Sequence, residues 1–158
     1  MTVTRATLPA DSALHPHITP GDFVDCYRAA CALSPRAAAE LIVDMPVWAA
    51  ALLRLRNLLV RPFGLHTDAP PAEDCIGMFP VELDTNQELI AGFDDSHLNF
   101  RLSVLQQDGM LYLSTWVHRN NLLGHVYLAV VLPFHILIVR NGLRRAARAP
   151  QTRSPDAV

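Results

Sequence analysis

The sequence predicts an α+β fold in which an antiparallel sheet packs on one long C-terminal helix. Two observations support this prediction. Residues 121–147 form the longest apolar stretch of the chain. Before it, Asp108-Gly109 suits a two-residue type I′ turn between two alternating segments, 97–107 and 110–118. A sheet with one apolar face and a helix with so much apolar surface would cover each other.

A chain of 158 residues, 51% of them hydrophobic, is long enough for one domain with its own core. We expect a flexible N-terminal arm at 1–20, a single domain at 21–149 and a disordered tail at 150–158. All 13 basic residues are arginine and the formal net charge is −2. This balance argues against the concentrated basic face that a nucleic-acid partner requires.

The cysteines and the N-terminus indicate a cytoplasmic protein. Cys26, Cys31 and Cys75 are an odd number without metal-type spacing, which favours reduced, buried thiols. The first residues contain no continuous apolar stretch of the kind that forms a secretory signal.

The C-terminal stretch could instead be a membrane span. Its uninterrupted apolar core, Val126 to Val139, contains Pro133 and His135. This core is shorter than the roughly 18 to 20 residues that a helix needs to cross a bilayer. We therefore expect no membrane span but a buried helix, bent where Pro133 removes a hydrogen bond.

The other elements follow from start and stop signals. Ser34 and Pro35 give an N-cap and a first helical position, and Asp44 and Pro46 repeat this pattern. Pro80 predicts an edge strand, because proline cannot donate to a central ladder. The predicted order begins with a strand at 22–28 and a helix ending at Val43. A second short helix follows, with an apolar stripe of Trp48, Leu52, Leu55 and Leu59. Strands at 76–83 and 88–93 come next.

The predicted turn fixes the register of the hairpin. Placing Gln107 opposite Met110 makes the remaining pairs follow by counting along both strands. One face then carries His97 and the pairs Ser103 with Ser114, Arg101 with Trp116 and Asn99 with His118. The opposite, apolar face, which we expect to meet the helix, carries Leu98, Phe100, Leu102, Val104, Leu113, Thr115 and Val117.

The C-terminal helix is expected to begin at a cap formed by Asn120 or Asn121. A period of 3.6 residues predicts a sheet-facing stripe of His125, Ala129, Leu132, Ile136, Val139 and Leu143. The rest of the helix surface is apolar too, so a second cover is needed. The earlier helices, a ligand or another subunit could supply it.

Three phrases in this order resemble a bacterial family, the domain of unknown function 2867, within the START-like (SRPBCC) superfamily. They are MPVWAAALLRLRNLLVRPFGL, GFDDSHLNFRLSV and STWVHRNNLLGHVYLAVVLPFHILIV. The resemblance implies a helix-grip fold, in which a curved antiparallel sheet packs on the C-terminal helix, with two shorter helices after the first strand. It also implies a cavity between sheet and helix that holds hydrophobic small molecules in related families, and no established reaction.

Four side chains near the hairpin are candidate catalytic groups: Asp95, His97, Arg101 and His118. A histidine can move protons near neutral pH, and Arg101 could bind an anion. The alternative is a solvated sheet face on which Arg101 lies over its cross-strand partner. Asp95 could equally belong to a turn, where aspartates cap backbone amides.

The candidate ligand-binding residues are Trp116, His125, Leu132, Ile136 and His135. His125 and His135 cannot share a metal ion, since ten helical residues separate them by about 15 Å. We expect no metal and no cofactor.

Three functions remain open. The leading hypothesis is a binding module for a hydrophobic or amphipathic small molecule. The second is a small-molecule enzyme of the cyclase, dehydratase or hydrolase type that uses His97, Arg101 and His118, which requires at least two of them to converge in a concave site. The third is a homodimeric interaction protein that buries the surplus apolar surface of the final helix.

Overall fold

The computed structural model describes residues 2–44 and 72–150 and confirms the α+β class. Its helices are α1 (Pro35–Val43), α3 (Leu122–Arg148) and the short 3-10 turn η1 (His15–His17). Its strands are β1 (Thr4–Arg5), β2 (Phe23–Ala30), β3 (Cys75–Ile76), β4 (Phe79–Asp84), β5 (Glu88–Asp94), β6 (Leu98–Gln107) and β7 (Met110–Arg119). The second short helix that the sequence predicts after Asp44 lies outside the described residues.

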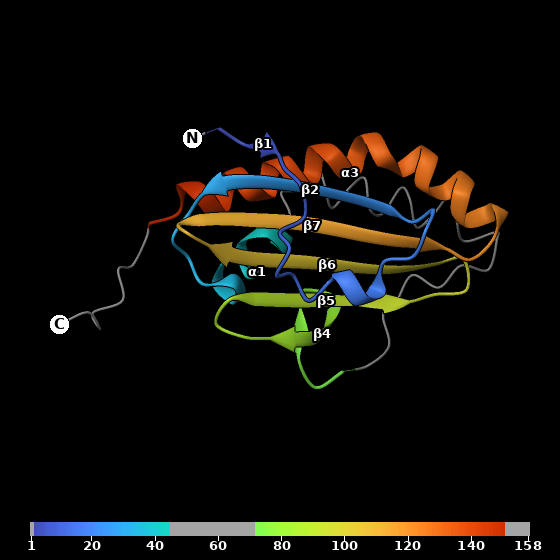
Figure 1. Cartoon of the computed structure of the whole chain (residues 1–158), viewed down its shortest axis with the longest axis horizontal. Coiled ribbons are helices and arrows are strands. Elements are labelled where there is room, and N and C mark those ends of the chain that lie inside the picture. Colours follow the sequence, from blue (N-terminus) through green and yellow to red (C-terminus); the bar gives the residue numbers. More distant parts are fainter. Residues whose placement is uncertain (1, 45–71, 151–158) are drawn as a thin grey trace.

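The strands form one curved antiparallel sheet in the order β1-β2-β7-β6-β5-β4-β3. On one face α3 packs against β2 and β7, and α1 packs against β5 and β6. The N-terminal segment crosses the opposite face (Figure 1). The molecule therefore has three layers, with the sheet in the middle.

The β6–β7 hairpin has the predicted turn and register. Asp108 and Gly109 have φ values of 53° and 74°, as a type I′ turn requires at both central positions. Gln107 lies opposite Met110, and Arg101 lies opposite Trp116. The apolar face of the hairpin contributes to the main core, as expected.

The start of α3 sets which of its faces meets the sheet. The side chain of Asn121 caps the helix by accepting a hydrogen bond from Gly124 N at 3.0 Å. A Cβ at Gly124 would lie 2.1 Å from the carbonyl oxygen of His97, so only glycine permits this approach. The buried positions of α3 that follow are Leu128, Val139, Gly142, Leu143, Ala146 and Ala147.

The predicted stripe is therefore only partly correct. Val139 and Leu143 are buried as expected, but His125 and Ala129 are exposed. The reason is the glycine contact, which turns Gly124 rather than His125 toward the sheet. A hydropathy pattern cannot reveal this rotation, because the helix is apolar on nearly every side.

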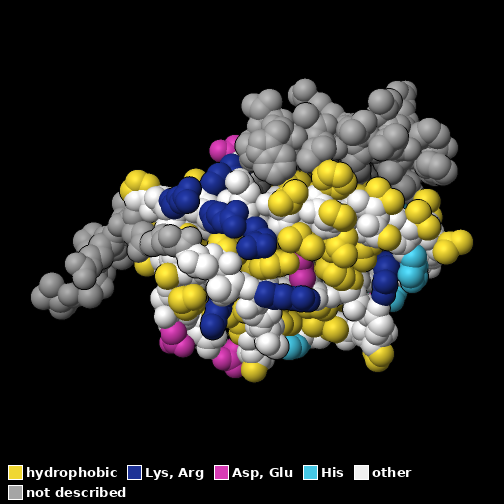
Figure 2. Space-filling view, turned by 90° about the horizontal axis from the view of Figure 1, so that it is seen from above, with side chains coloured by type: hydrophobic (Ala, Val, Ile, Leu, Met, Phe, Trp, Pro, Cys, Tyr) yellow, Lys and Arg dark blue, Asp and Glu magenta, His cyan; other side chains and the backbone are white. Residues whose placement is uncertain are grey.

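The outer face of α3 exposes a row of large apolar side chains: Leu122, Val126, Val130, Phe134 and Leu137. Figure 2 shows hydrophobic side chains on this side of the molecule, with basic side chains nearer the C-terminal tail. In the described part of the chain, α3 is the one helix long and apolar enough to cross a membrane, and 11% of its most apolar stretch is buried. Length and composition alone do not separate a span from a helix packed by one face. The prediction of a buried helix therefore holds for the face of α3 that packs on the sheet, whereas its outer face is exposed.

Contacts at the C-terminal half of α3 hold α1 in place. Gly142 lies directly against Ile42. Arg145 donates hydrogen bonds to the carbonyl oxygens of Ile42, at 3.1 Å, and of Asp44. These are free carbonyl groups at the end of α1, which a cation stabilises.

The N-terminal segment is packed rather than flexible, which corrects the prediction for residues 1–20. Leu14 is fully buried with Ile90 and Trp116. The buried carboxylate of Glu88 accepts hydrogen bonds from Ser12 Oγ at 2.6 Å and from the backbone N–H of Ala13 at 2.7 Å. An apolar side chain and a buried acceptor thus fix a segment whose prolines suggested an irregular arm.

The three cysteines are free thiols, and two of them are buried as predicted. Burial raises the pKa of Cys26 and of Cys31. Cys75 is exposed, contrary to the prediction, because it lies in the two-residue strand β3 at the edge of the sheet.

Candidate ligand-binding cavity

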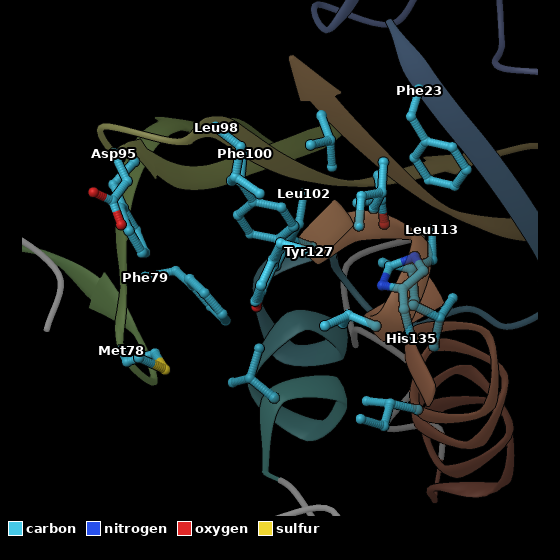
Figure 3. A pocket seen from close by; sticks show the side chains of 18 of the residues that line it. Phe23, Met78, Phe79, Asp95, Leu98, Phe100, Leu102, Leu113, Tyr127 and His135 are labelled. Atoms are coloured by element: carbon cyan, nitrogen blue, oxygen red, sulfur yellow. The ribbon is translucent and has the colours of Figure 1, made fainter. Parts of the chain in front are cut away.

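A cavity of about 230 Å³ lies between the apolar face of the sheet and the two helices (Figure 3). The alternation of β6 and β7 points every second side chain into it, including Phe100, Leu102 and Leu113. From α3, Tyr127, Val131 and His135 reach it at helical spacing. The remaining lining residues are Phe23, Ile42, Val43, Met78, Phe79, Phe93, Asp95, His97, Leu98, Thr115, Val117, Leu128, Ile138 and Val139.

One wall of the cavity contains a histidine paired with a buried carboxylate. His135 Nε2 lies 3.1 Å from Asp25 Oδ2, with side chains that are 18% and 4% exposed. The ring of Phe23 meets the imidazole edge to face, with centroids 6.3 Å apart. Asp25 stands opposite Thr115 in the β2–β7 ladder. These contacts give the apolar cavity a polar position.

A second pair, Asp95 and His97, lines the cavity from the turn between β5 and β6. Asp95 Oδ2 lies 3.3 Å from His97 Nδ1, and both side chains are almost fully buried. The imidazole packs edge to face on Tyr127, with ring centroids 5.1 Å apart. In Figure 3, Asp95 and His135 lie on opposite sides of the cavity, with Phe100 and Tyr127 between them.

The position of His97 corrects the prediction that it shares the polar face of β6. His97 precedes the first residue of the strand, and Asp95 N bonds Leu98 O across a tight turn. Strand alternation does not extend through such a turn. The imidazole therefore points to the helix side, into the cavity.

Arg101 and His118 are on the other face of the sheet, so the predicted group of His97, Arg101 and His118 is not brought together. Arg101 donates to Glu82 at 2.5 Å and to Asp94 at 2.7 Å. Burial opposes its charge, but these two carboxylates outweigh that effect and raise the pKa of Arg101.

Trp116 and His118 both bind the carboxylate of Asp22 beneath the N-terminal segment. The distances are 2.8 Å from Trp116 Nε1 to Oδ2 and 2.6 Å from His118 Nδ1 to Oδ1. Burial raises the pKa of Asp22, but hydrogen bonds from the backbone of Thr19, from His118, from Trp116 and from the Thr19 hydroxyl outweigh it, and the pKa falls to about 2. This carboxylate holds the N-terminal layer onto the sheet.

Of the five predicted ligand-binding residues, the structure places one at the cavity and four elsewhere. His135 lines the cavity, whereas Leu132 and Ile136 are half-buried and are not among its lining residues. His125 is exposed and bonds the carbonyl oxygen of Asn121 at 2.9 Å. Trp116 lies on the opposite face of the sheet, in the cluster with Leu14.

The sequence profile of a family described as "Protein of unknown function (DUF2867)" matches residues 18–142. The chain belongs to this family. A search of curated proteins and a search of solved structures each found no match. The matched span of this DUF2867 chain contains Asp95, His97 and His135 of the cavity wall, and Asp25, which pairs with His135.

The pair of Asp25 and His135 was missed by sequence reasoning, although one signal points to it. Phe23, Asp25 and Tyr27 alternate along the first strand, so they share a face. Two aromatic neighbours on that face indicate a buried carboxylate, which needs a partner. The partner stands 110 residues later on α3, a distance in sequence that local patterns do not cover.

Proposed function

We propose that this DUF2867 protein binds a hydrophobic or amphipathic small molecule in the cavity between the sheet and α3. The single observation that supports it is the cavity of about 230 Å³, mostly lined by apolar side chains, where a core of this size would otherwise be packed. The space is partly open to solvent, and an apolar occupant would remove the apolar side chains around it from water, which stabilises the complex.

The finer placement of the chain is part of the same proposal. The curved antiparallel sheet packed on a long C-terminal helix supports a START-like helix-grip fold, and the sequence resemblance supports a bacterial origin. The three free thiols support a cytoplasmic location.

The catalytic alternative loses its original motivation, because Arg101 and His118 are on the opposite face of the sheet from the cavity. Asp95, His97 and the Asp25-paired His135 do line the cavity, but an Asp–His pair also serves as a polar anchor for a ligand. We assign the pairs that role.

Native mass spectrometry of the purified protein tests the proposal, with naphthalene added as a small apolar probe. An engineered apolar cavity of about 150 Å³ binds benzene, so a larger cavity accepts two fused rings. We expect a bound molecule in the wild-type protein, carried from the cell or taken up from the probe.

A matched pair of variants assigns that binding to the cavity. Val131 lines the cavity, whereas its neighbour Val130 is 61% exposed on the outer face of α3. We expect Val131→Phe to reduce probe affinity at least tenfold by filling the space, and Val130→Phe to change it less than twofold. Equal effects of the two substitutions, or no uptake by the wild-type protein, would refute the proposed function.

A further inference from the structure

We infer that the cavity selects a neutral ligand carrying a hydroxyl group, which hydrogen-bonds to His135, the lining histidine that is paired with Asp25. This inference rests on the proposed function and adds the chemical class of the ligand.

Two atoms of the pair have no hydrogen-bond partner among the described residues. Asp25 Oδ1 is buried and has no hydrogen-bond partner within residues 2–44 and 72–150. His135 uses Nε2 toward Asp25 Oδ2, and in the same described ranges no hydrogen bond reaches its Nδ1. His135 lines the cavity, whereas Asp25 is not among its lining residues. The atom of the pair that a ligand can meet is therefore His135 Nδ1.

A hydroxyl is the donor that suits the pair in either protonation state of the histidine. The carboxylate accepts the Nε2 proton, so a neutral His135 presents Nδ1 as an acceptor. An imidazolium would present a donor there instead. A hydroxyl group both donates and accepts, so it can bond to either form of Nδ1.

The charge of the cavity wall argues against an anionic ligand. Asp95 lines the cavity and Asp25 lies directly behind His135, whereas the lining residues within 2–44 and 72–150 include no arginine. A carboxylate ligand at His135 would therefore approach two carboxylates. An ammonium group would lose its hydration in a largely apolar space, which costs several kcal/mol. A neutral hydroxyl avoids both penalties.

The place of the pair fixes how the ligand would lie. His135 is on one side of the cavity, and Phe100 and Tyr127 provide apolar and aromatic surface beside it (Figure 3). The hydroxyl would point to His135, while the carbon skeleton fills the space toward β6. The volume of about 230 Å³ suits a compact alcohol or phenol rather than a long-chain lipid.

Three probes with one ring system test the inference: naphthalene, 2-naphthol and 2-naphthoate, each titrated calorimetrically into the wild-type protein at pH 7. We expect 2-naphthol to bind about tenfold more tightly than naphthalene, and 2-naphthoate to bind more weakly than either. Equal affinity for naphthol and naphthalene, or tighter binding of naphthoate, would overturn the hydroxyl assignment while leaving the proposed function standing. Failure of all three probes would overturn both.

A double variant then attributes the selectivity to the pair. Asp25→Leu with His135→Phe removes both partners, which leaves no buried polar group unpaired. We expect it to keep naphthalene affinity within about twofold and to lose the preference for naphthol. The control is Asp22→Asn with His118→Phe, which alters the Asp–His pair on the opposite face of the sheet and should keep that preference. Retained preference in the first double variant would contradict the assignment, and if that variant does not fold, the wild-type probe series decides alone.

Discussion

Asp22, Asp25 and Asp95 are three carboxylates that each meet a histidine, and their surroundings give them different roles. Asp22 accepts hydrogen bonds on both oxygens and holds the N-terminal segment. Asp25 has one oxygen that no described residue bonds. Asp95 lies at the cavity beside His97. Location therefore separates the structural carboxylate of Asp22 from Asp25, which holds a cavity histidine, and from Asp95, which lines the cavity.

The low pKa of Asp22 predicts a pH-dependent contribution to stability. The folded-state pKa of about 2 lies below the ordinary value of 3.8. The stabilisation is therefore full above about pH 3.8 and is lost as the pH falls toward 2. We expect Asp22→Asn to lower the free energy of unfolding by about 1–2 kcal/mol at neutral pH, and by clearly less at about pH 3.

Urea denaturation of the wild-type protein and the variant at both pH values measures this difference. Asp11→Asn is the control, because Asp11 is an exposed residue of the same segment. Its effect should stay within about 0.5 kcal/mol. A cost of Asp22→Asn that does not depend on pH would show that the carboxylate charge is not responsible.

At the scale of elements, two of the main features follow from local rules. Asp108 and Gly109 define the turn of the hairpin, and the period of two then fixes every pair along β6 and β7. Ser34 and Asn121 cap α1 and α3 as their positions in the sequence predict. Such features need only neighbouring residues, so the sequence is sufficient for them.

The orientation of α3 depends instead on one contact between distant elements. Gly124 lies against the backbone of His97, 27 residues earlier in the chain. We expect Gly124→Ala to destabilise the protein by about 2 kcal/mol, even though alanine favours the helix by about 1 kcal/mol relative to glycine. Thermal or chemical denaturation measures this effect.

Gly142→Ala is the matched control in the same helix. A Cβ at Gly142 would meet a methyl group of Ile42 at 3.1 Å and its carbonyl oxygen at 3.2 Å, which is less severe than the 2.1 Å approach at Gly124. We expect its cost to be under about 1 kcal/mol. A Gly124→Ala variant as stable as the wild type would mean that this contact does not set the orientation of α3.

On the scale of the whole molecule, the sequence predicts the sheet, the long helix and the face on which they meet. It does not predict the packed N-terminal segment, because Ser12 bonds to Glu88, 76 residues away, and Leu14 is buried against Ile90 and Trp116 of distant strands. It also misses the pair of Asp25 and His135 for the same reason. Single-sequence patterns describe one element at a time, whereas a binding site is assembled from several.

The outer face of α3 is a large apolar surface that does not line the cavity. Its exposed apolar side chains, such as Val130 and Leu137, agree with the prediction that this helix has more apolar surface than the sheet can cover. A homodimer through this face stays a prediction. It would leave the cavity on the opposite side of the helix.

The central claim, that the space between sheet and helices is a ligand site, is tested most directly by intermolecular nuclear Overhauser effects from bound naphthalene. We expect contacts with Leu113 and Val131, which line the cavity, and none with Trp116 on the opposite face of the sheet. Contacts confined to Val126 and Val130 on the outer face of α3 would contradict the claim, as would the absence of contacts at saturating probe concentration.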